Sequence, residues 1–310
     1  MKSTAKTLLV LALGIMLIPC LVFFKDKLQN NSTNPLTDEV KILSSESGDI
    51  ITISRRDYLL YSTLAAISAD HSDEVLKAQI VLQNTYIAHE RQFFEKSLNG
   101  ADISDDETVY QKILSKDEAG ELYENLDEIT DKLYSLIDEV YDEILTYKSS
   151  PIAVAFFESS FGRTESSKDI WGEEISYLKS VSCESDKDIG ETSTEISNDD
   201  LKKKIESAFD LTLSDNYKSW IKITKKSNAD TPLRIEIDGQ KEVLASEFYK
   251  AIGILSQHFS VSASDDSFTF ITKGSGHLVG MSQSYAEALS DDGKDYKQIL
   301  KYFFNGCEIT

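Results

Sequence analysis

The chain is poor in the residues that bind metals and form disulfides. Its 310 residues include 3 cysteines, 4 histidines and 2 tryptophans. It contains no His-Glu-x-x-His and no Cys-x-x-Cys, the spacings that bring two metal ligands together. A nucleotide-binding loop is also missing, because Gly274-Ser275-Gly276 lacks the spacing of a phosphate-cradling fingerprint. We therefore expect neither a metal nor a cofactor.

Basic residues are scarce relative to acidic ones. The chain has 32 Lys+Arg against 53 Asp+Glu, so its formal charge is 32 − 53 = −21. A nucleic-acid ligand is excluded, because its phosphates must be neutralised by positive charge. A basic partner or a neutral glycan fits this charge better. Acidity that only keeps the surface soluble is the other interpretation.

Only one long apolar run is present, from Thr7 to Phe24, with Lys2 and Lys6 before it and Lys25 after it. This length is sufficient to span a bilayer. No small-residue cleavage site follows the run, so the pattern favours an uncleaved anchor over a signal peptide. We expect a cytoplasmic tail at residues 1–6, a transmembrane helix at 7–24, a tether at 25–48 and an extracytoplasmic domain at 49–310.

Two cysteines, Cys183 and Cys307, would lie outside the membrane, where a disulfide can persist. The sequence alone cannot bring their Cα atoms within bridging distance. Pairing is therefore left open.

The strongest helical signal follows Ser72, which can cap a helix whose first turn carries Asp73 and Glu74. Apolar residues then recur on two faces of the helix and leave a narrow polar seam with Lys77 and Asn84. A helix that is apolar on two sides is usually buried between other elements. We expect it to form the centre of the domain.

The rest of the chain predicts an α+β fold with mostly antiparallel strands. A short strand is expected at 49–54, a long helix from Asp117 to Ile144, and a hairpin formed by 144–147 and 152–157. Residues 183–198 are rich in Ser, Thr and acids and predict a surface loop. In the last third, Asp238-Gly239 marks one hairpin, a second is expected at 259–273, and helices are expected at 201–209, 246–252, 282–289 and 295–304.

Two residues stand out as candidates for ligand contact. His277 lies between Gly276 and Gly280, where backbone can approach a ligand closely, although it can equally make a structural hydrogen bond at a tight turn. Glu165 lies in a polar segment after a predicted strand. It can contact a ligand or bond to the backbone of its own loop.

Several motifs occur in an order that resembles the stage II sporulation protein D family. They are Asp57-Tyr58, Leu76-Lys77-Ala78-Gln79 with Thr85-Tyr86, Gly162-x-Thr164-Glu165, Trp171 with Tyr177-Leu178-Lys179-Ser180-Val181, Gly274-x-Gly276-His277-x-x-Gly280-Met281-Ser282-Gln283, and Tyr296 to Leu300 with Gly306. Each motif alone is weak, but together they are specific. The resemblance runs from about residue 50 to the carboxyl end.

The resemblance implies a membrane-anchored protein that acts on or binds peptidoglycan during engulfment of the developing spore. Relatives cleave denuded glycan strands as lytic transglycosylases, and some are called amidase enhancers. That chemistry needs one well-placed Glu as acid and base. The family's Glu column falls on Ala66, and loss of a general acid costs roughly 10²- to 10⁴-fold in rate. If the chain is active, Asp70, Glu74 or Glu165 must replace that acid.

Other columns of the family have also changed in this chain. Phe161 stands where the family often has Gly, and Leu278 replaces a Gly after the histidine. Some relatives hold zinc with His and Cys near the Gly-x-Thr-Glu loop, but residues 156–183 contain no His and a single Cys. The comparison therefore predicts no zinc.

Our interpretation is a non-catalytic member that binds peptidoglycan glycan strands or supports partner wall hydrolases. Other stage II sporulation membrane proteins and an amidase are the candidate partners. An active transglycosylase with a relocated acid is the alternative, so the sequence leaves open whether the chain is an enzyme. The candidate ligand-binding residues are Arg163, Thr164, Glu165, His277, Ser282 and Gln283.

Overall fold

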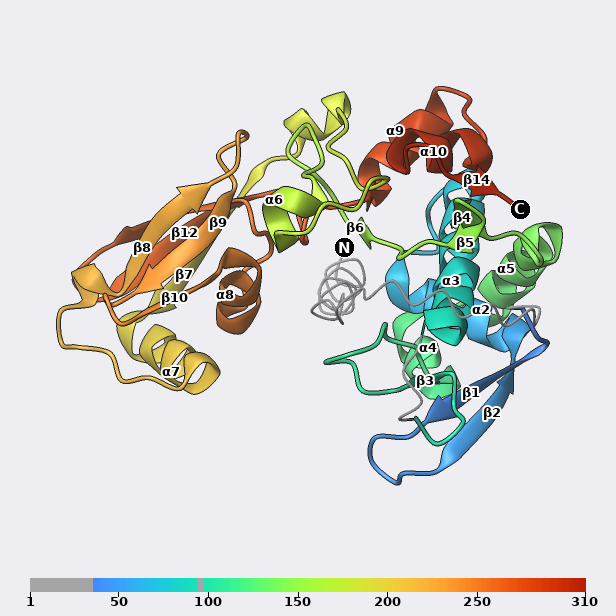
Figure 1. Cartoon of the computed structure of the whole chain (residues 1–310), viewed down its shortest axis with the longest axis horizontal. Helices are drawn as coiled ribbons and strands as arrows, with labels where there is room; N and C mark the ends of the chain where they lie inside the picture. Colours follow the sequence, from blue (N-terminus) through green and yellow to red (C-terminus); the bar gives the residue numbers. More distant parts are fainter. Residues whose placement is uncertain (1–35, 94–97) are drawn as a thin grey trace. The chain divides into compact units, whose positions relative to one another are not determined.

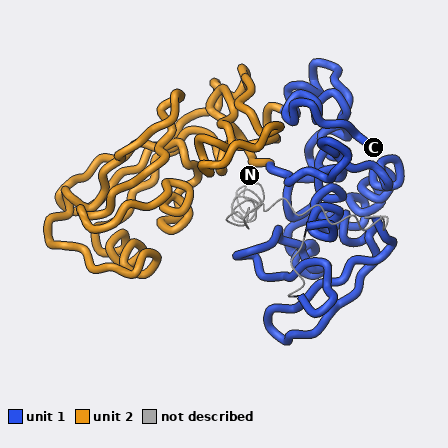
Figure 2. The backbone as a smooth tube through the Cα atoms, viewed as in Figure 1, with its two compact units in different colours: residues 1–155, 286–310 blue, residues 156–285 orange. Residues whose placement is uncertain are grey.

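The computed structural model describes residues 36–93 and 98–310. The chain divides into two compact units, residues 1–155 with 286–310 and residues 156–285 (Figure 2). We call them unit 1 and unit 2. No helix within 36–93 or 98–310 combines the length and the apolar character needed to cross a membrane. The expected anchor at 7–24 and residues 25–35 of the expected tether lie outside the described residues.

Unit 1 is built around helices and contains two small sheets, one of which packs against α3 through β4 and β5. Its sheets have the strand orders β2-β1-β3 and β14-β4-β5. In chain order its elements are β1 (Glu39–Leu43), β2 (Ile50–Ser54), α2 (Arg55–Ala66), α3 (Asp73–Phe93), β3 (Ile103–Ser104), α4 (Lys116–Leu122), α5 (Leu126–Val140), β4 (Leu145–Tyr147), β5 (Ser150–Pro151), the end of α9 (Gln283–Asp291), α10 (Tyr296–Phe303) and β14 (Glu308–Ile309).

Helix α3 is the predicted central helix, and it packs against α2, α5 and α10 (Figure 1). Its polar seam is also buried in part: Asn84 has no exposed surface. The Asn84 amide donates to the carbonyls of Tyr141 (2.8 Å) and Glu143 (3.0 Å). Arg55 of α2 is 2% exposed and donates to the same Tyr141 carbonyl and to Asp142. These polar groups connect α2, α3 and the turn after α5.

Unit 2 contains two three-stranded antiparallel sheets, β10-β9-β8 and β11-β12-β7. Two short strands, β6 and β13, pair in parallel. In chain order its elements are β6 (Phe156–Phe157), α6 (Ser167–Trp171), the 3₁₀ helix η2 (Glu184–Asp188), β7 (Glu191–Ser197), α7 (Asn198–Phe209), the 3₁₀ helix η3 (Tyr217–Ser219), β8 (Ile221–Lys226), β9 (Pro232–Ile237), β10 (Lys241–Leu244), α8 (Ala245–Ile252), β11 (Phe259–Ala263), β12 (Ser267–Lys273), β13 (Met281–Ser282) and the start of α9.

The core of unit 2 is rich in aromatic side chains from the strands and from helices α7 and α8. Trp220 and Phe268 are stacked with ring centroids 5.9 Å apart, and Phe248 and Phe259 at 6.1 Å. The predicted turn at Asp238-Gly239 joins β9 to β10. With Ile237 paired to Lys241 the loop has three residues, and Asp238 and Gly239 both have positive φ (48° and 66°), the backbone conformation for which Asp-Gly is favoured in hairpin loops.

The α+β class and its antiparallel strands are confirmed, but four local predictions need correction. The expected long helix is two helices, because Tyr123 takes an extended conformation after α4 ends at Leu122, and α5 begins only at Leu126. The expected loop at 183–198 contains η2 and β7. Strand β7 was missed because its side chains are mostly exposed and show no apolar alternation.

The other two corrections concern strand partners. In the expected hairpin of 144–147 with 152–157, β4 pairs with β5 at Ser150–Pro151, and β6 pairs with β13 instead. Strand β1 lies within the range that we expected to be tether. Its residues Val40 and Ile42 are 0% and 8% exposed, so the folded part of unit 1 begins before residue 49.

Candidate functional site

The position where the resemblance requires an acid is the last residue of α2. Ala66 is 6% exposed, and Ile67 caps the helix by donating its N–H to the Thr63 carbonyl (2.9 Å). The chain then forms a loop, residues 67–72, that leads into α3. Neither Ala66 nor Ile67 can transfer a proton.

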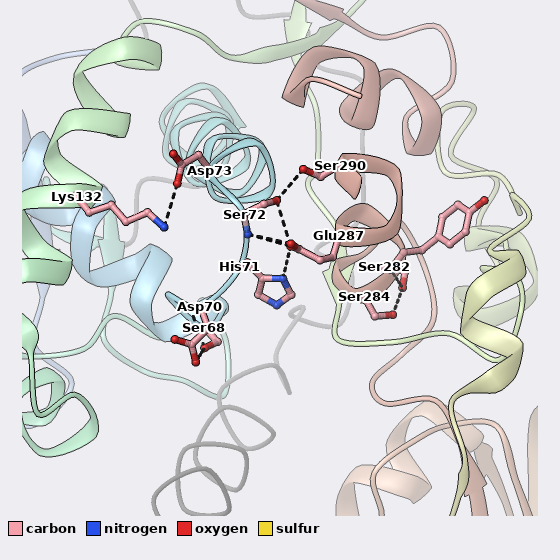
Figure 3. A network of polar contacts seen from close by, with 11 residues as sticks. Ser68, Asp70, His71, Ser72, Asp73, Lys132, Ser282, Ser284, Glu287 and Ser290 are labelled. Carbon is pink, nitrogen blue, oxygen red and sulfur yellow. Dashed lines mark hydrogen bonds and ion pairs between the residues drawn. The ribbon is translucent and has the colours of Figure 1, made fainter. Parts of the chain in front are cut away.

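The replacement acids named from the sequence have different surroundings. Asp70 is exposed, and its carboxylate accepts only a hydrogen bond from Ser68 (3.2 Å) among the contacts of the described residues (Figure 3). Glu74 is half-buried, forms an ion pair with Lys77 and accepts from the N–H of Tyr296 (2.8 Å). Glu74 therefore has a structural role at the start of α10, whereas Asp70 is available to solvent.

A cluster that the sequence did not reveal fixes the same loop to α9 within unit 1. One Glu287 oxygen lies 2.8 Å from His71 Nδ1 and accepts from the Ser72 hydroxyl (3.2 Å) and N–H (3.1 Å). The Ser72 hydroxyl also contacts Ser290 at 2.9 Å. In Figure 3 the second ring nitrogen of His71 points away from Glu287. The carboxylate therefore orients the imidazole and leaves one nitrogen directed elsewhere.

The Gly162–Glu165 motif is held in place by the segment at 177–183. Thr164 has no exposed surface, and its hydroxyl accepts from the N–H of Val181 (2.9 Å). Arg163 is exposed, and its guanidinium donates to the Ser180 hydroxyl at 2.8 Å and 3.1 Å. Two motifs that are separate in the sequence are thus one structural element in unit 2. Thr164 is buried inside this element and helps hold its two segments together, whereas Arg163 is exposed to solvent.

Glu165 is joined to the glycine-bearing motif through its backbone. Its N–H donates to the carbonyl of Leu278 (2.7 Å), and its carboxylate accepts from the Ser227 hydroxyl (2.7 Å). The residue is 3% exposed. The carboxylate therefore contacts a side chain, Ser227, and not the backbone of its own loop as the structural alternative expected. A ligand contact stays a prediction.

His277 is buried between two aromatic rings. Its ring centroid lies 5.8 Å from the ring centroids of both Phe157 and Trp171. Its Nδ1 accepts a hydrogen bond from the Val279 N–H (3.1 Å). Burial, and secondarily the charge of Lys250, lowers the pKa of His277 to about 3. The imidazole is therefore neutral at physiological pH. Trp171 is half-buried, so part of its side chain is accessible to solvent.

Asp186 is a second residue that the sequence analysis missed. This buried carboxylate of η2 accepts from the hydroxyls of Ser160 (2.7 Å), Ser282 (2.7 Å) and Ser284 (2.6 Å), and from the Ser160 N–H (3.0 Å). It is 2% exposed. It therefore links the loop after β6 to β13 and to the start of α9. The sequence did not indicate that Asp186 is buried, because the residue lies in the segment at 183–198 that was predicted to be a surface loop.

Ser282 and Gln283 were both named as candidate ligand-binding residues. The structure places them at the junction of β13 and α9, where they are 0% and 2% exposed. The Ser282 hydroxyl donates to Asp186. Their role as ligand contacts stays a prediction.

Cys183 and Cys307 are free thiols in the structure, and burial raises the pKa of each to about 12. Among residues 36–93 and 98–310, no three His, Cys, Asp or Glu side chains gather in a way that could hold a metal ion.

The comparisons with known proteins agree with the motifs. The chain is 28% identical to the stage II sporulation protein D of Bacillus subtilis (strain 168), over 100% of this chain and 96% of that protein. It is 26% identical to the protein of the same name from Bacillus amyloliquefaciens, over 87% and 78% of the two chains. Similarity of this extent to both proteins supports the resemblance to the stage II sporulation protein D family that the motifs indicated.

The amidase enhancer of Bacillus subtilis (strain 168) is also similar, at 26% identity over 56% of this chain and 32% of that longer protein. None of the protein-family models compared with the chain matches it.

Leu278, at the position where the motifs predicted a family glycine, has an unusual backbone conformation. Its φ of 68° lies in the left-handed region that glycine adopts freely. The residue is completely buried. A leucine held in this conformation costs about 1–2 kcal/mol in backbone strain.

Proposed function

We propose that this family member is a wall-facing sporulation protein that binds peptidoglycan glycan strands and supports partner wall hydrolases during engulfment. In this proposal residues 7–24 anchor it in the cell membrane, with the amino terminus in the cytoplasm. The names of its relatives support the connection to sporulation and to an amidase. The protein is proposed to be catalytically degenerate.

The observation that carries the degenerate assignment is the buried methyl group of Ala66 at the end of α2. Glycosidic cleavage requires an acid that first protonates the leaving oxygen and then acts as a base. Glu74 is already used by Lys77 and by the first turn of α10. Glu165 is buried and bonded to Ser227.

Glycan binding is supported by the surface around the Gly162–Glu165 loop of unit 2. Arg163 is exposed there, and the half-buried Trp171 offers an aromatic surface that can pack on the apolar face of a sugar ring. Sugar hydroxyls need donors and acceptors, and the guanidinium supplies several donors.

Active transglycosylase function is the second candidate, and the loop after Ala66 favours it in one respect. This loop presents the exposed Asp70 beside His71, whose imidazole is oriented by Glu287. An acid and an oriented imidazole can both move protons. In this case cleavage would depend on Asp70 or His71.

The assay that separates the two candidates is release of anhydro-muropeptides from amidase-treated peptidoglycan by the full-length chain in detergent. We expect no release above a heat-denatured control. Robust release would refute the degenerate assignment. Its loss in Asp70→Asn or in His71→Gln would then identify the replacement group.

Binding is tested by sedimentation of the same protein with denuded glycan strands. We expect retention of the wild type and weaker retention of Arg163→Ala and Trp171→Ala. Lys168→Ala, which removes one exposed positive charge from α6, is the matched control and should bind normally. Glu165→Gln and His277→Gln test the buried candidates. If the wild type stays in the supernatant, glycan binding is refuted and a protein-only support role remains.

A further inference from the structure

The outer strand of the β2-β1-β3 sheet in unit 1 has one unpaired edge. Strand β2 pairs with β1 from Glu39↔Ser54 to Leu43↔Ile50, and no other strand of the described chain pairs with it. Figure 1 shows the β1–β2 hairpin extending from the helices of unit 1. An edge of this kind presents backbone donors and acceptors to an incoming strand.

The hydrogen bonds that flank the hairpin show which backbone groups face outward. At one end the Ser44 N–H donates to the Asp49 carbonyl (2.8 Å), and at the other the Arg55 N–H donates to the Asp38 carbonyl (2.7 Å). Antiparallel pairs alternate between bonded and non-bonded positions. The peptide groups of Ile50 and Thr52 therefore point away from β1.

The side chains of β2 are unusual for a free edge. Ile50 and Ile51 are 40% and 52% exposed, and they lie on opposite faces of the strand because successive side chains alternate. They are two of the five large hydrophobic residues exposed in the described chain. Natural edges are usually protected by charged residues or proline, and Ile50–Ser54 contains neither.

Charge decides what kind of chain can approach this edge. The hairpin turn carries exposed Glu46 and Asp49, and Asp105 adjoins the same turn by accepting from the Ser45 N–H (2.6 Å). The described residues of unit 1 contain 12 Lys+Arg and 29 Asp+Glu, so they carry 12 − 29 = −17, against 15 − 22 = −7 for unit 2. A second copy would be repelled, and a basic chain would be attracted.

We propose that β2 is a docking strand for an extended segment of a basic partner protein. The segment adds to the sheet antiparallel to β2, places β-branched side chains against Ile50 and Ile51, and carries Lys or Arg at its carboxyl end, beside the hairpin turn. Backbone hydrogen bonds give the affinity, and the charges set its direction. The inference rests on the partner-supporting part of the proposed function and is independent of glycan binding.

The probe is a fluorescein-labelled peptide, Val-Thr-Val-Thr-Val-Lys-Lys-Lys, and the comparison peptide has Glu in place of Lys. Binding to the full-length chain in detergent is followed by fluorescence anisotropy. We expect saturable binding of the lysine peptide that weakens with added salt, and binding of the glutamate peptide that is at least about tenfold weaker. Equal binding of both peptides, or no binding, would overturn the proposal.

Variants identify the surface. Thr52→Pro removes an outward N–H without breaking a bond to β1, and Ile51→Lys places a charge on the strand; each should weaken binding about tenfold or more. Val109→Lys changes another exposed aliphatic residue outside β2 and should leave binding within about twofold. Unchanged binding by both β2 variants would place the peptide elsewhere and reject the assignment.

Two further measurements distinguish this proposal from self-association and from glycan binding. Sedimentation velocity should show no self-association. Self-association that Thr52→Pro abolishes would make a second copy the occupant and overturn the basic partner. Retention on denuded glycan strands should be the same for wild type and for both β2 variants. Peptide binding without glycan retention would refute glycan binding alone, and glycan retention without peptide binding would refute the docking strand alone.

Discussion

His71 and Glu287 are 216 residues apart in the sequence, yet His71 Nδ1 lies 2.8 Å from a Glu287 carboxylate oxygen. The same carboxylate accepts from the N–H and hydroxyl of Ser72. The contact fixes the loop between α2 and α3 to helix α9, within unit 1. The carboxyl-terminal segment of the chain therefore determines the conformation of the loop that follows Ala66.

Replacing Glu287 should loosen this loop. Glu287→Ala leaves the half-buried donors of His71 and Ser72 without their acceptor, and we expect a loss of about 1–3 kcal/mol in the free energy of unfolding. Hydrogen exchange at residues 67–72 should accelerate as well. Asp291→Ala on the same helix is the control, because Asp291 is exposed, and its effect should stay within about 0.5 kcal/mol. Equal effects of the two variants would contradict the role given to Glu287.

Asp186 should be the most sensitive acid in unit 2. Asp186→Ala removes the acceptor of three serine hydroxyls and of the Ser160 N–H, so we expect a loss of about 3–5 kcal/mol. Both tryptophans, Trp171 and Trp220, lie in unit 2, so urea unfolding followed by tryptophan fluorescence reports on this unit. Asp188→Ala, an exposed acid in the same 3₁₀ helix, is the control and should shift the midpoint only slightly. A small effect of Asp186→Ala would show that the serine network does not stabilise the motif.

Gly274 should not tolerate a side chain. A Cβ at this position would lie 2.5 Å from the Ser159 carbonyl oxygen, and the residue has a φ of +66°. Gly274→Ala should destabilise unit 2 by several kcal/mol, roughly 3 or more, because the clash is with backbone. Gly293→Ala in unit 1 is the control: its φ is +80°, but an added Cβ would have no other atom within 4 Å. It therefore introduces backbone strain without a clash and should cost about 1 kcal/mol. Thermal unfolding of the two variants makes the comparison, and a Gly274→Ala midpoint no lower than that of Gly293→Ala would refute the close packing.

Acid should destabilise unit 2 through the buried His277 and the half-buried His258. Burial, together with the charge of Lys273, lowers the pKa of His258 to about 4, and burial lowers that of His277 to about 3. The ordinary pKa of histidine is 6.5, so between pH 6.5 and these lowered pKa values the unfolded chain binds more protons than the folded chain. The contribution of the neutral rings is therefore complete above pH 6.5 and is lost as the pH falls toward 4 and then 3.

The variant that tests this pH dependence is His258→Gln, which can keep the hydrogen bond to Thr231 but cannot titrate. Tryptophan-detected urea midpoints should fall between pH 7 and pH 5 more steeply for the wild type than for the variant. Parallel pH profiles would show that His258 titrates normally in the folded protein.

Local signals in the sequence predicted most of the regular elements correctly. The apolar faces after Ser72 predicted α3, and Asp238-Gly239 predicted its hairpin, because each signal lies within the element that it specifies. The break between α4 and α5 was missed, because an apolar period can continue across a three-residue interruption. Strand β7 was missed because its pairing with β12, not its own pattern, makes it a strand.

The sequence by itself determined the acidic charge, the family motifs and the absence of a Glu at position 66, because each is a property of residue identity and order. Only the tertiary structure decided which acids are available. In the folded chain, Glu74 accepts a hydrogen bond from the first residue of α10, and Asp186 is buried among three serines. Asp70 stays exposed to solvent, and Glu287 contacts His71. These assignments depend on contacts between residues far apart in the chain, and such contacts leave no periodic signal in the sequence.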